Sequence, residues 1–287
     1  MFERVFKLSE HKTTVKTEVM AGITTFMTMA YILAVNPSVL GSTGMDTTAV
    51  LLATALASCL GTLCMAFMAN LPFALSAGMG LNAFMAYTVV AGYGYSWQVA
   101  LLAVFIEGLI FIVLSLTNVR EAIFNAIPLT LKKGVSVGIG LFIAFIGLQN
   151  SGLCVDSATL VGIISFPENF HTAGICALLT LIGLFFTAVF YTRKMKGAIL
   201  YGILLTWILG MICQVTGLYV PTPDAGFYSL FPSWGMTDFS RLGLTFGQCF
   251  NVDFSNVGIV NFIIVVFSFL FVDIFDTLGT LIGVATK

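Results

Sequence analysis

Charge is scarce in this sequence. Only 9% of its 287 residues are Asp, Glu, Lys or Arg, whereas soluble domains usually carry about 25%. The net charge of −1 leaves no basic surface that could follow a phosphate backbone, so nucleic acid is excluded as a partner. Residues 1–17, a charged N-terminal segment, lack the apolar core of a cleavable signal peptide.

Cysteine motifs are also lacking. The six cysteines form no C-x-x-C pair, and four of them lie inside apolar runs, where cysteine behaves as a small hydrophobic residue. The sequence therefore predicts neither a zinc site nor a disulfide framework. Cys154 and Cys249 could face the same side and pair.

Long apolar runs are abundant instead. Apolar residues make up 59% of the chain, and the mean hydropathy is +1.03. The runs reach about 20 residues, the length that a helix needs to cross a hydrocarbon core of about 30 Å. The sequence therefore predicts an all-α polytopic membrane protein.

The eight expected spans are 18–37, 48–69, 73–92, 97–117, 129–149, 171–191, 198–218 and 258–285.

The positions of Lys and Arg predict the orientation of these spans. With the N-terminus in the cytoplasm, eleven of the twelve Lys and Arg lie on the cytoplasmic side, and Arg241 lies outside. We therefore expect a multi-pass protein of the cell membrane (inner or plasma membrane) with a cytoplasmic N-terminus. The cytoplasmic set is Arg4, Lys7, Lys12, Lys16, Arg120, Lys132, Lys133, Arg193, Lys194, Lys196 and Lys287.

Two connections have features of their own. Residues 118–128 predict a cytoplasmic amphipathic linker with one apolar and one charged face, which ends at Pro128. Residues 219–257 predict a long extracytoplasmic connection, in which a short interfacial helix near 235–248 is a further expectation.

The last span, 258–285, carries carboxylates at membrane depth. In a helix, four residues stand at i, i+3, i+4 and i+7 and share one stripe: Asp273, Asp276, Thr277 and Thr280. An ionisable group costs about 2.5–3.5 kcal/mol at the centre of a membrane, so this stripe needs a cavity, a partner or a ligand. Gly279 lies on a different side, where another helix could approach closely.

Residues 73–92 do not have the pattern of an ordinary span. Pro72 precedes them, and the segment Ser-Ala-Gly-Met-Gly at 76–80 is too small and flexible for a uniform helix. We expect an extended stretch that becomes a helix near Gly80, with Asn82 in its first turn. Transporters use such breaks to point backbone N–H groups at a polar substrate. The structural alternative is a packing surface with Asn82 bonded to a neighbouring helix.

Two further spans contain polar residues. Glu107, in the middle of 97–117, is either a proton-handling group or a residue paired with a polar neighbour. In the first span, the hydroxyls of Thr24, Thr25 and Thr28 are expected to bond back to helix carbonyls, which is a packing role.

Four segments together resemble a known family. In chain order they are TTFMTMAYILAVNP, LSAGMGLNAF, GVSVGIGLFIAFIGLQNSG and FVDIFDTLGTLIGVA. They are similar to the azaguanine-like purine permeases of the nucleobase transporter superfamily, which carry guanine, hypoxanthine or adenine into the cell with protons. The resemblance covers nearly the entire chain.

The resemblance implies a fold of fourteen helices in two inverted seven-helix repeats, divided into a core domain and a gate domain. Residues 18–117 would form core helices one to four, residues 129–218 gate helices five to seven, and residues 258–287 core helix eight. The remaining helices are absent before Lys287, so we expect this sequence to be a fragment of a longer protein.

The resemblance also implies a substrate site. Ala77, Gly78 and Asn82 would lie beside the base, and Asp276 or Asp273 would accept from its N–H groups. Asp276 is favoured because it adjoins the Thr-Leu-Gly-Thr turn, and Asp273 remains a close second. Thr280 would lie one turn further along the stripe and also bind substrate.

Proton coupling is implied as well, through Asp276, Asp273 and Glu107, with the proton gradient in place of a cofactor. A carboxylate accepts from two donors and an amide both donates and accepts, which suits the edge of a purine. Three aromatic residues could stack on the ring: Phe73, Phe84 and Phe275. The implied partners are a purine nucleobase and the lipid bilayer. Homodimer formation and sodium in place of the proton stay open.

Two alternatives use the same residues differently. An intramembrane aspartyl protease needs its carboxylates on separate helices with a G-x-G-D motif, which this sequence does not contain, so no enzyme is expected. An anion or other solute carrier or channel on the same fold would prefer a basic or neutral group where this chain has acids. That carrier remains the alternative function.

Overall fold

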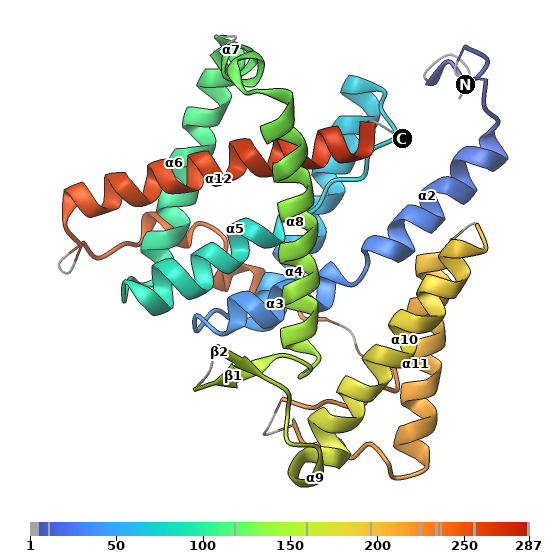
Figure 1. The fold of residues 1–287 in the computed structure, drawn as a ribbon. Helices are drawn as coiled ribbons and strands as arrows, with labels where there is room; N and C mark the ends of the chain where they lie inside the picture. Colours follow the sequence, from blue (N-terminus) through green and yellow to red (C-terminus); the bar gives the residue numbers. More distant parts are fainter. Residues whose placement is uncertain are drawn as a thin grey trace. The chain divides into compact units, whose positions relative to one another are not determined.

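The computed structural model describes residues 6–10, 12–117, 119–158, 160–195, 197–223, 226–232, 235, 237–254 and 257–285, without the side chains of 120, 121, 123, 124, 278 and 281–285. Helices make up most of its regular structure (Figure 1). The α-helices are α2 (Val15–Met29), α3 (Ile32–Gly41), α4 (Thr47–Cys64), α5 (Met79–Ala83), α6 (Trp97–Leu116), α7 (Val119–Ala126), α8 (Leu129–Asn150), α9 (Phe166–Asn169), α10 (Ile175–Thr192), α11 (Ala198–Val215) and α12 (Ile259–Ala285).

Shorter turns extend several of these helices. Wider π-helical turns follow α4 and α5 and precede α10, and tighter 3-10 turns lie before α12. The wider turns are η1 (Met65–Ala69), η2 (Phe84–Gly92) and η3 (Phe170–Gly174), and the tighter turns are η5 (Phe239–Leu244) and η6 (Gln248–Phe250). The last two occupy the region in which a short interfacial helix was expected.

Seven helical stretches of the described chain are long and apolar enough to cross a membrane. They are Val15–Gly41, Thr47–Ala69, Trp97–Leu116, Leu129–Asn150, Phe166–Thr192, Ala198–Val215 and Ile259–Thr277. A shorter apolar helix, Met79–Gly92, lies where the third span was predicted. The prediction of a helical polytopic membrane protein is confirmed.

The first span differs from the single helix that was predicted. It is divided between α2 and α3, and Leu33 and Ala34 donate to carbonyls three residues earlier, so the backbone tightens at the junction. The threonine hydroxyls behave as expected, since Thr24, Thr25 and Thr28 each donate to a carbonyl of their own helix.

One small hairpin was not predicted from an all-α sequence. Strand β1 (Val155–Ser157) pairs antiparallel with β2 (Leu160–Gly162), with Asp156 opposite Val161. Strands of three residues are too short to show an alternating pattern in the sequence.

The loops and cysteines complete the comparison with the sequence. All six cysteines are free thiols in the structure. Helix α7 lies within the predicted linker, and α8 begins directly after Pro128. Several of the charged residues used for the orientation lie outside the described residues: Arg4, Lys196 and Lys287.

The chain folds into two compact units. The first comprises Met1–Lys12, Met29–Ile143 and Thr237–Lys287, and the second comprises Thr13–Thr28 and Ala144–Met236. The second unit is built on α10 and α11, which pack along their lengths (Figure 1). Buried Ile175 and Leu179 of α10 pack with Tyr219, whose hydroxyl donates to the carbonyl of Tyr228 at 2.7 Å.

Small residues bring α10 and α11 together reciprocally. A Cβ at Gly183 of α10 would overlap the side chain of Thr206, and a Cβ at Gly202 of α11 would overlap Thr187. Each threonine hydroxyl donates to the glycine carbonyl of its own helix, Thr187 to Gly183 and Thr206 to Gly202. Glycines at such positions let the two backbones approach closely.

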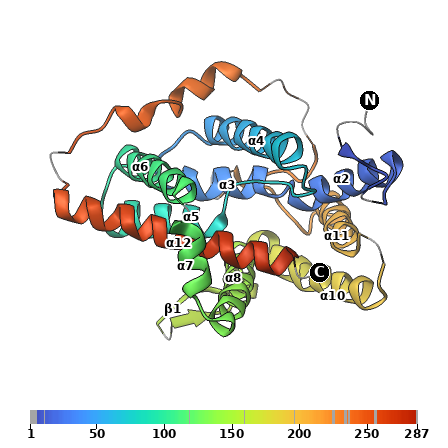
Figure 2. The same cartoon turned by 90° about the horizontal axis from the view of Figure 1, so that it is seen from above.

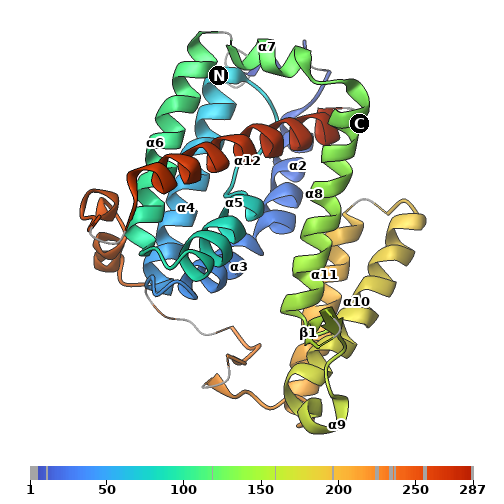
Figure 3. The same cartoon turned by 60° about the vertical axis from the view of Figure 1, so that its left-hand side comes forward.

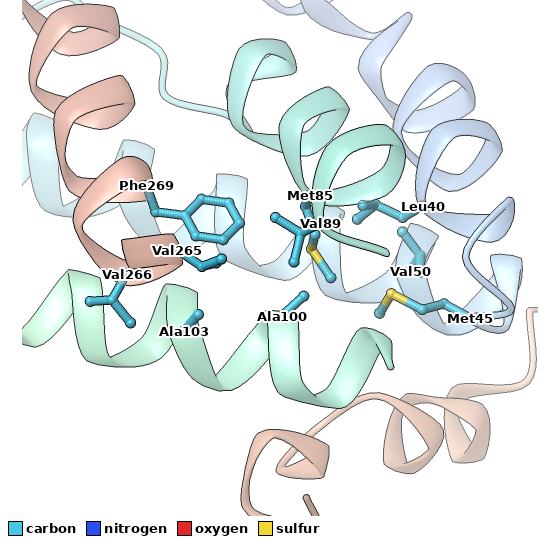
Figure 4. Close-up of a cluster of buried hydrophobic side chains, with 10 residues drawn as sticks. All are labelled: Leu40, Met45, Val50, Met85, Val89, Ala100, Ala103, Val265, Val266 and Phe269. Atoms are coloured by element: carbon cyan, nitrogen blue, oxygen red, sulfur yellow. The ribbon is translucent and has the colours of Figure 1, made fainter. Parts of the chain in front are cut away.

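In the first unit, α12 lies beside α6, and α5 lies between α3 and α12 (Figures 2 and 3). A cluster of buried apolar side chains joins α3, α4, η2, α6 and α12 (Figure 4). At its centre the ring of Phe269 meets Phe84 edge to face, with the ring centroids 5.0 Å apart. The cluster is Leu40, Met45, Val50, Met85, Val89, Ala100, Ala103, Val265, Val266 and Phe269.

Candidate functional site

The third span is broken as the sequence predicts. Residues 70–78 form no helix, and Asn70 has the left-handed backbone conformation that ends η1. Gly78 is still extended, with φ of −75° and ψ of 121°, and α5 begins at Met79, one residue before Gly80. Residues 72–77 therefore belong to no helix. Inside a membrane the backbone groups of such a stretch require partners within the protein.

Hydroxyl groups of α4 supply part of that need. The hydroxyl oxygen of Thr62 accepts from the backbone N–H of Leu75 at 3.0 Å and lies 3.2 Å from the Leu75 carbonyl, to which it donates. The hydroxyls of Ser58 and Ser76 are hydrogen-bonded at 2.8 Å. Thr54, Ser58 and Thr62 are spaced four residues apart and form one hydroxyl stripe on α4. Ser58 and Thr62 bond the extended stretch, whereas Thr54 bonds Asn36 of α3.

Asn82 is held by a buried chain of hydrogen bonds. Its Nδ2 donates to Oδ1 of Asn36 on α3, and Nδ2 of Asn36 donates to Oγ1 of Thr54 at 2.7 Å. The Thr54 hydroxyl donates to the carbonyl of Val50, also at 2.7 Å. Asn36 and Thr54 are only 3% and 5% exposed. The structural alternative, in which Asn82 bonds a neighbouring helix, therefore applies to the NH2 group of its amide, which is bonded to α3.

Asp276 of α12 lies against the extended stretch. An ideal Cβ built on Gly78 would stand 2.8 Å from Oδ2 of Asp276, closer than real Cβ atoms approach an oxygen. Glycine therefore lets the carboxylate reach the backbone immediately before α5. Ala77, the preceding residue, is partly buried in the same stretch.

Asp273 has a different neighbour. It interacts electrostatically with Glu107 of α6, the helix that packs beside α12. Glu107 is 5% exposed, and its Oε1 has no hydrogen-bond partner among the described residues. The predicted stripe is thus divided, since Asp276 lies against the broken span, whereas Asp273 lies near enough to the acid of the fourth span to act on it electrostatically.

Thr280, the last member of the stripe, bonds its own helix. Its hydroxyl donates to the carbonyl of Asp276 at 2.8 Å and lies 3.2 Å from the carbonyl of Thr277. The structure therefore places Thr280 one turn beyond Asp276, with its hydroxyl proton donated to the Asp276 carbonyl. Toward a ligand the Thr280 oxygen could act only as an acceptor.

Helix α8 approaches the same region. Its Phe142 ring would lie 3.9 Å from an ideal Cβ on Gly80. At Gly279 of α12, an ideal Cβ would stand 3.2 Å from Val135 and 3.5 Å from the backbone of Ser136. The close approach expected at Gly279 is therefore present, and its partner is α8.

Sequence reasoning missed three residues of this site. Asn36 and Thr54 gave a weak signal, because they are polar residues inside apolar runs. Phe142 gave none, since 27 phenylalanines are spread along the chain. Of the proposed stacking residues, Phe84 is engaged with Phe269 in the core. Within the described residues, no group of three His, Cys, Asp or Glu could hold a metal ion.

Comparison with known proteins gives a consistent result. A model described as the Permease family matches residues 16–286. The adenine permease AdeP of Escherichia coli is 39% identical over 292 residues, covering 100% of this chain and 60% of the relative. Two proteins of Bacillus subtilis are similar: guanine/hypoxanthine permease PbuG is 44% identical (98% of this chain, 62% of the relative), and guanine/hypoxanthine permease PbuO is 42% identical (99% and 62%). The chain thus spans about three fifths of the length of these relatives.

Proposed function

The chain belongs to the nucleobase branch of the Permease family, and we propose that it forms part of a secondary active carrier for purine nucleobases (guanine, hypoxanthine or adenine). Its relatives are permeases, so an enzymatic role is set aside. The observation that carries the proposal is the meeting of the Asp276 carboxylate with the backbone of the broken third span at Gly78.

The polar groups around this meeting point suit a purine. Asp276 accepts hydrogen bonds from ring or exocyclic N–H groups, and Asn82 adds a second polar contact one turn into α5. Ala77 and the N–H of Gly78 contribute backbone groups that are not committed to a helix, whereas the Gly78 carbonyl already accepts from the Asn82 N–H. The ring of Phe142 lies near Gly80, and its proposed role is to stack on the base.

Transport is proposed to be proton symport into the cell. A carboxyl group in a membrane interior is less costly when it holds a proton than when it is charged. Asp276 could therefore take up a proton together with the base. Glu107 of α6 and Asp273 of α12, which interact electrostatically, would form a second protonation site. Coupling requires that substrate and proton bind the two facing states differently.

The movement belongs to the same proposal. Residues 18–117 and 258–287 would act as a core that moves against a gate containing 129–218, in one half of a fourteen-helix inverted repeat. The close approach of α8 to α12 at Gly279 supports a sliding contact between these parts, because Gly279 itself has no side chain to interlock with Ile139 and Val135 of α8. Residence in the cell membrane with a cytoplasmic N-terminus is proposed from the distribution of Lys and Arg.

The test is uptake of labelled hypoxanthine by cells that lack their own purine carriers and express the whole protein. Asp276→Asn should abolish uptake, whereas Asp156→Asn, the same change on an exposed strand, should not alter it. Competition by guanine, adenine and uracil would show the substrate class, and a protonophore should stop accumulation. Uptake that is indifferent to both Asp276→Asn and Asp273→Asn would refute the site. Transport of an anion without competition by purines would favour the alternative carrier.

A further inference from the structure

We propose that Asn36 and Thr54 are positioning residues that determine which end of the Asn82 amide faces the substrate. The consequence is that Asn82 offers its carbonyl oxygen to the purine. The inference rests on the proposed function, in which Asn82 contacts the base. It adds the reason why the Asn82 amide presents its acceptor oxygen, and not its NH2 group, at this contact.

The polarity follows from a backbone carbonyl. The carbonyl of Val50 can only accept, so the Thr54 hydroxyl, 2.7 Å away, must spend its single proton on it. The Thr54 oxygen then has only lone pairs left for its other neighbour. The group of Asn36 that faces Thr54 must therefore be the donor, Nδ2, at 2.7 Å.

The same reasoning carries one step further. With Nδ2 of Asn36 directed at Thr54, its Oδ1 is the atom that faces Asn82, and an oxygen of this kind can only accept. Asn82 must therefore present Nδ2 to Asn36. A reversed Asn82 amide would set two carbonyl oxygens against each other. Asn36 and Thr54 are buried, so water cannot easily correct such a mismatch.

The outcome at the site is an excess of acceptors. Within the described residues no donor is hydrogen-bonded to Oδ1 of Asn82, and Asp276 near Gly78 is a second acceptor when ionised. Gly78 directly precedes α5 and Asn82 lies in its first turn, with the Asn82 N–H bonded to the Gly78 carbonyl. A purine edge with adjacent N–H donors, as in guanine, matches two acceptors better than the mixed donor and acceptor edge of adenine.

The buried hydrogen-bond chain from Thr54 to Asn82 therefore predicts a preference between purines. Thr54→Val keeps the shape of the side chain but removes the acceptor for Asn36, so that neither direction of the Asn36 amide is preferred. Asn82 is then free to turn. Guanine should lose about tenfold in affinity relative to adenine, roughly the value of one net hydrogen bond. Thr54→Ser retains the hydroxyl and should retain the wild-type ratio.

The experiment measures inhibition constants of guanine and adenine against labelled hypoxanthine uptake, together with surface expression. Asn36→Ala should shift the guanine-to-adenine ratio in the same direction as Thr54→Val. Because Thr54 acts through Asn36, adding Thr54→Val to Asn36→Ala should produce no further shift. This pair of variants also covers the case in which one of them fails to reach the membrane.

Each outcome bears on a different claim. Equal loss for guanine and adenine in Thr54→Val, or a ratio shift in Thr54→Ser, would show a role in packing alone and overturn the inference. Absence of purine uptake by the wild type, or no change in either inhibition constant for Asn82→Ala, would instead overturn the proposed function. A shifted ratio in Thr54→Val with a normal ratio in Thr54→Ser supports the positioning role.

Discussion

Gly78 and Asp276 occupy adjoining space: an ideal Cβ on the glycine would stand 2.8 Å from Oδ2 of the aspartate. The two residues belong to segments far apart in the sequence, the extended stretch before α5 and the middle of α12. The Asp276 carboxylate can thus reach the broken span because Gly78 has no side chain. The candidate site exists because these two features meet.

Gly78→Ala tests that relationship. The new methyl group would collide with the Asp276 carboxylate, so we expect purine affinity to fall by about tenfold or more, as for a lost hydrogen bond to a charged group. The matched control is Gly80→Ala, because a Cβ there meets Phe142 at 3.9 Å, an ordinary contact. Inhibition constants against labelled hypoxanthine measure both. Equal effects of the two changes would mean that the Asp276 contact is not what matters.

Glu107→Gln tests the second acidic pair. Glutamine has nearly the shape of the carboxylic acid but cannot exchange a proton, so it removes the ionisable group of α6 that interacts electrostatically with Asp273. We expect accumulation of purine against a gradient to be lost and to become insensitive to external pH, while exchange of labelled for unlabelled purine persists. Glu168→Gln, at an exposed position, is the control. Accumulation that stays normal in Glu107→Gln would exclude this residue from coupling.

The interface of α10 and α11 predicts a non-additive pair. Gly202→Ala forces a methyl group into Thr187, and overpacking of this kind costs about 1–3 kcal/mol. Adding Thr187→Ala makes room, so the double variant should be more stable than Gly202→Ala alone. The thermal unfolding midpoint in detergent measures the effect. Gly138→Ala is the control, since nothing lies within 4 Å of its Cβ position. A double variant no more stable than the single one would argue against the reciprocal packing.

Asp46 has two roles that separate substitutions can distinguish. Its Oδ1 accepts from the N–H of Ala49 and caps α4, while its Oδ2 accepts from Arg241 at 3.0 Å. Asp46→Asn keeps the cap and should cost about 0.2–1 kcal/mol, because the ion pair is partly exposed. Asp46→Ala also removes the cap and should lower the free energy of unfolding by about a further 0.5–2 kcal/mol. Unfolding midpoints at low and high salt give both values. Salt should reduce the Asn effect and leave the capping contribution, and a salt-independent Asn effect would contradict the ion pair.

The sequence by itself determined the class of protein, the places of the spans, the break in the third span and the acidic stripe in the last. These features depend on local quantities, such as the length of an apolar run, the helix propensity of a few residues and the cost of a charge in lipid. The same local reasoning did not find the division of the first span between α2 and α3 or the hairpin of β1 and β2.

Only the tertiary structure decided how the polar residues are partnered. It placed Asp276 against Gly78, set Asp273 beside Glu107, and joined Asn82 to Thr54 through Asn36. Each of these contacts joins two different segments of the chain. A local pattern shows which face of a helix is polar, but it does not show which other segment that face meets. The direction of the Asn82 amide is the clearest case, because a carbonyl on another helix sets it.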